Sequence, residues 1–270
     1  MVIDGLHILH GVDFDVASAG VTALLGRNGA GKTTTVKAVM GLVPRTGSIR
    51  LSGAETSSLP THLVVRHGIG FAPEDRGIFA GLTVAENLRL AERGAPGGAP
   101  GGAPGGASGG AGAGEPNYAL VHELFPELKQ RAGQLAGTLS GGQQQMVAIG
   151  RTLLNRNRLI IADEPTKGLA PKIVSEVAEV LARAADAVPV LLVEQNLALV
   201  RRLAGTCAVL ADGRTAHRGD TAELLADEEA ARRLLGVGSR YPLAGGLRPA
   251  SSSPAASPAA APVVTTEVKP

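Results

Sequence analysis

Gly26-Arg27-Asn28-Gly29-Ala30-Gly31-Lys32-Thr33-Thr34 decides the fold, because its spacing is that of a phosphate-binding loop. It follows Val21-Thr22-Ala23-Leu24-Leu25, an apolar run typical of a buried strand, and a helix is predicted over residues 33–43. Lys32 would supply positive charge to the phosphates and Thr33 a hydroxyl ligand for Mg²⁺. An ordinary turn is the alternative in a chain with 37 glycines, but the flanking strand and helix favour the loop. The predicted nucleotide contacts of this loop are Gly26, Asn28, Gly29, Gly31, Lys32, Thr33 and Thr34.

A second chemical signal is the pair Asp163-Glu164, which follows the apolar run Leu159-Ile160-Ile161-Ala162. A buried strand there would bring the Asp163 carboxylate to the C-terminal edge of a sheet, where open α/β sheets bind ligands. Asp163 is predicted to hold Mg²⁺ through water, and Glu164 to polarise the attacking water as a general base. Alone, such a pair is usually a solvated turn. Beside a phosphate loop, it indicates nucleotide hydrolysis.

The third signal is the segment Leu139-Ser140-Gly141-Gly142-Gln143. Ser140 and Gln143 have the spacing of a capping box, which predicts a helix start where a hydroxyl, N–H groups and the helix dipole form an anion site. Because the phosphate loop already provides one such site, a second implies a nucleotide shared between two copies. The alternative is a helix N-cap with a glycine hinge. The predicted contacts here are Ser140, Gly141, Gly142 and Gln143.

Strands and helices alternate along the rest of the chain, which predicts an α/β fold with a mainly parallel sheet. Further strands are predicted at residues 47–51, 68–72, 190–193 and 207–211. Helices are predicted over residues 84–93 and 173–185, where Pro171 suits a first helical position. Further helices are predicted to begin near Tyr118, Ser140 and Asp220.

Composition limits the class of protein. The 270 residues carry a formal net charge of +2 without a block of Lys or Arg, so no nucleic-acid partner is predicted. The single cysteine, Cys207, permits no internal disulfide and fits a reducing compartment. No apolar run approaches the roughly 18–20 residues that span a bilayer, and the N-terminus lacks an export signal. The chain is therefore predicted to be cytoplasmic, with membrane contact only through a partner.

Two segments differ in composition from the rest. Residues 94–114 repeat Ala-Pro-Gly-Gly, and residues 239–270 are rich in Ser, Pro and Ala. Neither can bury enough apolar surface to offset chain entropy, so both are predicted to be disordered.

With these three signals in this order, the chain resembles the ATP-binding subunits of ABC transporters over roughly residues 6–236. The resemblance implies a P-loop NTPase cassette at residues 1–238, with a helical subdomain at about 73–157 that carries the 94–114 insertion. It also implies ATP and Mg²⁺ as cofactors. In that family two subunits sandwich two ATP molecules, and each phosphate loop faces the Ser140 segment of the partner subunit.

Three positions depart from the family pattern. Glu74 stands where many members carry a magnesium-sensing Gln, and it is predicted to contact Mg²⁺ together with Thr33 and Asp163. Gln195 stands where many carry a switch His that contacts the γ-phosphate, so a catalytic role is predicted for it beside Glu164 and Lys32. Lys167 occupies a segment that touches the partner, where a small or acidic residue is more usual.

Several segments resemble one group of the family, the branched-chain amino acid importer ATPases. They are Pro73-Glu74 with Arg76, Glu-Leu-Phe-Pro at 123–126, residues 136–142, Gly168-Leu169-Ala170-Pro171 and Val193-Glu194-Gln195-Asn196. The urea and short-amide importer ATPases share part of this pattern, and residues 168–171 favour the amino acid group. The implied function is ATP hydrolysis that powers import of branched-chain or other hydrophobic amino acids.

The resemblance implies several partners: a second ATPase subunit, two membrane permeases and an extracytoplasmic substrate-binding protein. It places the chain at the cytoplasmic face of the membrane. Phe79, Leu82 and the helix start at Thr83–Glu86 are predicted to contact the permease, and ordinary packing is the alternative.

Two other functions compete with an active transporter ATPase. A binding-only subunit, whose partner hydrolyses ATP, is suggested by Gln195 and by an N-terminus that offers Ile3 or His7 where members usually stack an aromatic residue on adenine. The intact Glu164 argues against it. A soluble ABC ATPase of DNA repair or translation would resemble a chain with coiled-coil insertions or tandem cassettes, and neither is present here.

Overall fold

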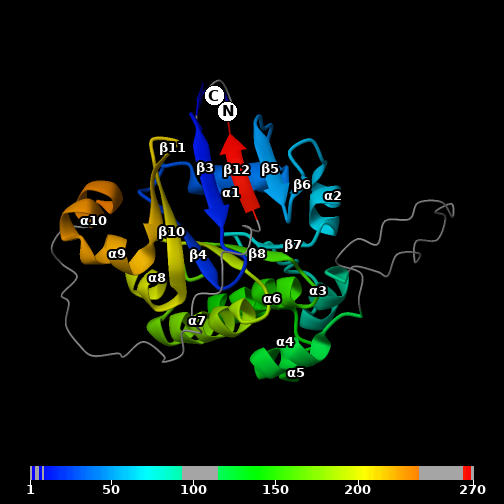
Figure 1. The fold of residues 1–270 in the computed structure, drawn as a ribbon. Helices are drawn as coiled ribbons and strands as arrows, with labels where there is room; N and C mark the ends of the chain where they lie inside the picture. Colours follow the sequence, from blue (N-terminus) through cyan, green and yellow to red (C-terminus); the bar gives the residue numbers. More distant parts are fainter. Residues whose placement is uncertain (1, 4–5, 8, 93–114, 237–263, 269–270) are drawn as a thin grey trace.

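The computed structural model describes residues 2–3, 6–7, 9–92, 115–236 and 264–268 (Figure 1). The predicted insertion at 94–114 lies outside the described residues, as does most of the predicted tail at 239–270. Within the described part, no helix is both long and apolar enough to cross a membrane.

A six-stranded sheet forms the centre of the molecule, in the order β11-β10-β4-β9-β8-β7. Neighbouring strands from β10 to β7 run parallel, while β11 pairs antiparallel with β10. This arrangement confirms the predicted α/β fold with a mainly parallel sheet. The strands are β4 Val21–Gly26, β7 Ile69–Ala72, β8 Leu159–Asp163, β9 Val190–Val193, β10 Ala204–Ala211 and β11 Arg214–Asp220.

Helices cover both faces of this sheet, and α3, α4 and α5 each pack against α6 below it in the view of Figure 1. The helix predicted over 84–93 ends earlier, at Leu90. The helix predicted around residues 173–185 spans Pro171–Ala185, with Pro171 at its first position as predicted. The helices are α1 Lys32–Met40, α2 Thr61–Arg66, α3 Val84–Leu90, α4 Tyr118–Leu124, α5 Pro126–Gln130, α6 Gly141–Leu153, α7 Pro171–Ala185, α8 Leu197–Leu203, α9 Thr221–Ala226 and α10 Glu228–Leu235, with a 3₁₀ turn at Ala136–Thr138.

A second, four-stranded sheet has the order β3-β12-β5-β6 and corrects the prediction of a fully disordered tail. Its strand β12 is Val264–Val268, which pairs antiparallel with β3 on one side and β5 on the other. Composition averaged over the tail hides the run Val-Thr-Thr-Glu-Val, in which four of the five residues are β-branched. Such a run has high strand propensity once two unpaired sheet edges lie beside it. The remaining strands are β3 Val12–Val16, β5 Ser48–Leu51 and β6 Ala54–Glu55, and a separate pair joins β1 Val2–Ile3 to β2 Leu6–His7.

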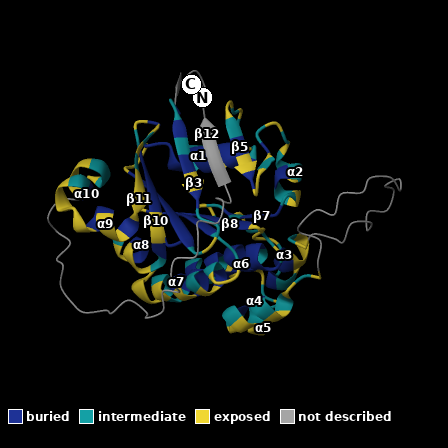
Figure 2. Cartoon of the chain, in the orientation of Figure 1, coloured by how far each residue is buried: buried dark blue, intermediate teal, exposed yellow. Residues whose placement is uncertain are grey.

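The core lies on both sides of the central sheet, as the buried residues in Figure 2 show. All six residues of β4 are buried, as expected for a parallel strand covered on both faces. Ala23 and Leu25 join the cluster that contains apolar residues of α6 and α7. Leu24 joins the other cluster, which includes Val36 of α1 and Phe14 of β3. The second sheet therefore packs over the helix that follows the phosphate loop.

Candidate active site

The phosphate loop joins the end of β4 to the start of α1, as the sequence predicts. Gly26 has a φ of 145°, and a Cβ at this position would lie 2.4 Å from the carbonyl oxygen of Leu210 in β10. Only glycine permits that approach of backbone to backbone. The loop is therefore seated directly on the neighbouring strand, with its N–H groups at the N-terminus of α1.

Lys32 lies in the bend of this loop with its side chain buried. Its ammonium donates to the carbonyl oxygens of Gly26 at 2.9 Å and Arg27 at 3.3 Å. Burial lowers the pKa of Lys32, an effect opposed by the negative charges of Glu164 and Asp163. The Lys32 ammonium lies 3.9 Å from Oε1 of Glu164, which brings the loop and the acidic pair together as predicted.

Thr33 and Asp163 meet across the gap between α1 and β8. The Thr33 hydroxyl donates to Oδ1 of Asp163 at 3.4 Å, and the Asp163 side chain is almost fully buried. Burial raises the pKa of Asp163 to about 6, although the Thr33 hydrogen bond acts in the opposite direction. A hydroxyl and a carboxylate oxygen side by side are ligands that Mg²⁺ prefers.

The residues around Thr33 and Asp163 form no closed metal cage. Among the described residues, no group of three or more His, Cys, Asp or Glu side chains is placed to hold a metal ion. Mg²⁺ usually takes only one or two carboxylates and completes its shell with water and substrate phosphates. The pair Thr33 and Asp163 therefore fits a magnesium ion that arrives with a nucleotide.

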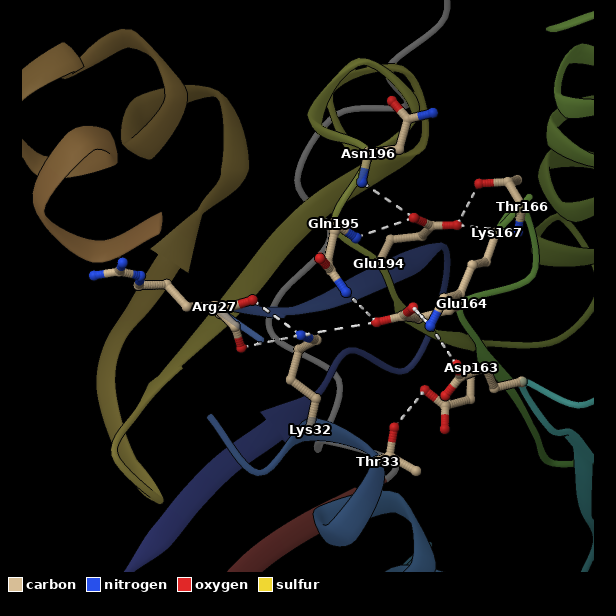
Figure 3. Close-up of polar contacts among 12 residues, drawn as sticks. Arg27, Lys32, Thr33, Asp163, Glu164, Thr166, Lys167, Glu194, Gln195 and Asn196 are labelled. Carbon is tan, nitrogen blue, oxygen red and sulfur yellow. Dashed lines mark hydrogen bonds and ion pairs between the residues drawn. The ribbon is translucent and has the colours of Figure 1, made fainter. Parts of the chain in front are cut away.

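Glu164 comes directly after β8 with a φ of 46°, a left-handed conformation that glutamate rarely adopts. Its backbone N–H donates to the carbonyl oxygen of Val193 at 2.8 Å, which fixes the turn. Figure 3 shows its carboxylate among Lys32, Gln195 and Lys167. Gln195 donates its side-chain N–H to Oε1, and the Lys167 ammonium lies 3.4 Å from Oε2.

Glu194 is a site residue that the motif analysis did not single out. It is buried, and it accepts hydrogen bonds from both the hydroxyl and the backbone N–H of Thr166. It also accepts from the backbone N–H groups of Gln195 at 3.0 Å and Asn196 at 3.1 Å. Glu194 thus ties the loop after β9 to the loop after β8 (Figure 3). Its place directly after the buried strand Val190–Val193 was the available signal.

Glu74 lies in the loop after β7, and its carboxylate pairs with the Lys167 ammonium. Both side chains line a hollow of about 840 Å³ that also includes Thr33 and Asp163. A second hollow, of about 370 Å³, is lined by Asn28 and Gln195 among others. Of the predicted nucleotide contacts, Gly26 and Asn28 line the smaller hollow and Thr33 lines the larger one.

The Ser140 segment forms the predicted helix start. The Ser140 hydroxyl accepts from the backbone N–H of Gln143 at 3.3 Å, and the Gln143 side chain accepts from the Ser140 N–H at 3.1 Å. The Gln143 amide also donates to Glu127 of α5 at 2.8 Å. In the described residues, no hydrogen bond joins this segment to the phosphate loop of the same chain.

Gly142 lies where α6 passes close to α7. A Cβ at Gly142 would lie 2.8 Å from Cγ2 of Ile173, so the helix start requires glycine for packing whatever else it contacts. The side chains of Ile3 and His7, predicted near adenine, lie outside the described part of the chain.

Comparison with known proteins agrees with this geometry. The ABC transporter family model matches residues 9–167. The chain is 33% identical over 235 residues to the probable branched-chain amino acid transport ATP-binding protein LivF of Archaeoglobus fulgidus, covering 86% of this chain and 94% of that protein. It is 37% identical over 233 residues to the high-affinity branched-chain amino acid transport ATP-binding protein BraG of Pseudomonas aeruginosa, with the same two coverages, 86% and 94%.

The fold matches solved cassettes as well. A nucleotide-free ATP-binding cassette from an ABC transporter superposes with a TM-score of 0.67 at 24% identity, covering 88% of this chain and 96% of that chain. At this identity the match supports the fold alone. The family match and the two relatives add the chemistry. The chain belongs to the ABC transporter family, as an ATP-binding cassette subunit that hydrolyses ATP.

Proposed function

We propose that this chain powers a membrane importer for branched-chain or other hydrophobic amino acids. The two relatives at 33% and 37% identity are both named for branched-chain amino acid transport. The segment Gly168-Leu169-Ala170-Pro171 supports the amino acid group over the urea and short-amide group.

The nucleotide would bind with its phosphates over the loop Gly26–Thr34, whose N–H groups stand at the start of α1. Lys32 is already aimed along this loop by its two carbonyl partners. Thr33 and Asp163 would hold Mg²⁺, with Glu74 on the rim of the same hollow. Bound Mg²⁺ supplies positive charge that neutralises the negative charge developing on the phosphates.

The observation that carries the hydrolytic part of the proposal is the position of the Glu164 carboxylate. It stands at the C-terminal end of β8, between the phosphate-loop lysine and Gln195. From there it would accept a proton from the attacking water as general base, while Gln195 holds the carboxylate in place. Lys32 would stabilise charge on the outer phosphates.

The proposal requires partners. Ser140 and Gly142 would act on the nucleotide held by the phosphate loop of a second ATPase subunit, because their own chain's loop is not in contact with them. The permease would rest near Phe79, whose ring is half exposed and lies 5.3 Å from the Arg151 guanidinium carbon, beside the capping box Thr83–Glu86. An extracytoplasmic protein would deliver the cargo, and the chain would sit at the cytoplasmic face.

The test combines turnover and uptake. Purified wild-type chain, Glu164→Gln and the matched control Glu229→Gln, at an exposed position of α10, are compared for ATP binding and Mg²⁺-dependent hydrolysis. We expect Glu164→Gln to bind ATP but to lose at least about 100-fold in turnover, as loss of a general base requires. Normal turnover by this variant would remove Glu164 from the base role. Binding without turnover by the wild type would indicate a binding-only subunit.

Cargo is tested in cells of the source organism that lack the chromosomal gene. Wild-type chain and Glu229→Gln should restore uptake of labelled leucine, while Glu164→Gln should not. Uptake of urea but not leucine would assign the chain to the other importer group.

A further inference from the structure

We propose that Lys167 is a positioning residue for ATP hydrolysis, which forms one charge-matched unit with Glu74 and holds the Glu164 carboxylate between Gln195 and itself. The inference rests on the proposed role of Glu164 as general base. The Lys167 ammonium contacts Oε1 of Glu74 and lies 3.4 Å from Oε2 of Glu164. Lys167 therefore joins the loop after β7 to the end of β8.

The balance of charge explains why the site needs this ammonium. Glu74 and Asp163 both line the hollow, and the negative charges of Glu164 and Glu74 both act on Asp163, where they raise its pKa. Lys32 directs its ammonium to two backbone carbonyls and lies 3.9 Å from Glu164, farther than Lys167 at 3.4 Å. Without Lys167, the Glu74 and Glu164 carboxylates would repel each other with no cation between them.

Hydrogen bonds also fix the backbone position of Lys167. Its backbone N–H donates to the carbonyl oxygen of Glu164 at 3.1 Å, which closes the turn between the two residues. The preceding Thr166 is fixed by its two hydrogen bonds to buried Glu194. Because the Lys167 side chain begins from this fixed turn, its ammonium reaches both the Glu74 and the Glu164 carboxylates from one place.

The other end of the bridge is anchored as well. The loop that carries Glu74 also carries Arg76, whose guanidinium donates to the Gln144 side chain of α6 at 3.0 Å. Lys167 therefore links the base to a loop that is tied to the helix beginning after Ser140. A shift of that loop would move Glu74, and through Lys167 the Glu164 carboxylate.

The bridge should affect turnover more than folding. The Lys167 side chain is 59% exposed, and exposed ion pairs contribute little to stability because solvent screens them. A carboxylate displaced from its productive position, in contrast, lowers the rate of the chemical step without changing nucleotide binding. The two effects are separable by comparing kcat, KM and Tm.

The experiment measures steady-state ATPase activity of the full chain with Mg²⁺ in wild type, Lys167→Ala, Lys167→Arg, Glu74→Gln/Lys167→Ala and Glu164→Gln. Lys172→Ala, at an exposed lysine of α7, is the matched control. We expect Lys167→Ala to lower kcat by about threefold to tenfold with KM for ATP within about twofold. Lys167→Arg should retain at least about half of kcat, because it keeps the charge.

The double variant Glu74→Gln/Lys167→Ala gives the most specific test of the proposal. Removing the Glu74 charge in the Lys167→Ala background removes the uncompensated repulsion, so kcat should recover by at least about threefold. A merely structural loss would not be rescued by a second substitution.

The outcomes separate this proposal from the proposed function. The positioning role is overturned if Lys167→Ala has the same kcat as the Lys172→Ala control, or if the double variant is no faster than Lys167→Ala. In either case, loss of activity in Glu164→Gln would still support Glu164 as the general base. Wild-type turnover by Glu164→Gln overturns both.

Discussion

Asp163 is expected to make the nucleotide-free chain less stable than it would be without this carboxylate. Its side chain is 1% exposed, and burial raises its pKa to about 6 from an ordinary value of 3.8. Because the folded form then binds a proton more readily than the unfolded form, ionisation opposes folding. The substitution Asp163→Asn keeps the size and the acceptor for Thr33 but removes the charge. It should therefore stabilise the fold while it weakens Mg²⁺ binding.

The size of the effect follows from the two pKa values. Above pH 6 the carboxylate is ionised in both states, and the full difference corresponds to about 3 kcal/mol. As pH falls from 6 toward 3.8, the folded form is protonated first, so the destabilisation shrinks to about 1 kcal/mol at pH 4.5 and disappears below both pKa values. The gain from Asp163→Asn should therefore be about 2 kcal/mol larger at pH 7.5 than at pH 4.5.

Urea unfolding in EDTA without nucleotide, at pH 7.5 and pH 4.5, tests this reasoning. Asp15→Asn, the same change at an exposed position of β3, is the control and should shift stability by less than about 0.5 kcal/mol at both pH values. Equal stability of Asp163→Asn and wild type at pH 7.5, or a gain that is the same at both pH values, would refute the assignment of a burial cost to the Asp163 carboxylate.

Two other predictions concern packing. Gly142→Ala places a methyl group 2.8 Å from Cγ2 of Ile173, so the free energy of unfolding measured in urea should fall by about 1–3 kcal/mol. The double variant Gly142→Ala/Ile173→Ala should recover part of that loss. Equal stability of Gly142→Ala and wild type would show that α6 and α7 are free to separate. Deletion of residues 264–270 removes β12 and leaves two open sheet edges, so amide hydrogen exchange in β3 and β5 should accelerate at least about tenfold. Deletion of residues 269–270 alone is the control and should leave the exchange rates unchanged. Equal exchange rates in both deletions would contradict the pairing of β12.

Parts of this fold could be predicted because their signals are local. Three signals each occupy fewer than about ten consecutive residues: the phosphate loop, the acidic pair after β8 and the capping box at Ser140. Over such short stretches the spacing of the residues alone determines the local backbone structure. β12 could not be predicted in the same way. It pairs with β3 and β5, which lie more than 200 residues earlier in the chain, and the composition of the surrounding tail outweighed five β-branched or charged residues in any window average.

The site itself shows why local signals stop short of the chemistry. Three acids end or follow three different strands, with Glu74 after β7, Glu164 after β8 and Glu194 after β9. Each is visible in the sequence, but the strand order is not, and it is the order β4-β9-β8-β7 that places these loops side by side next to Lys32. Once the strand order is known, the meeting of these loops follows, because the carboxyl ends of parallel strands all lie at one edge of the sheet. Glu194 reaches Thr166 from the neighbouring loop, and Lys167 reaches Glu74 across a separation of 93 residues. The departures at Glu74 and Lys167, which read as unrelated along the chain, are therefore one contact in space, and substitutions at either position should be interpreted as changes to the pair.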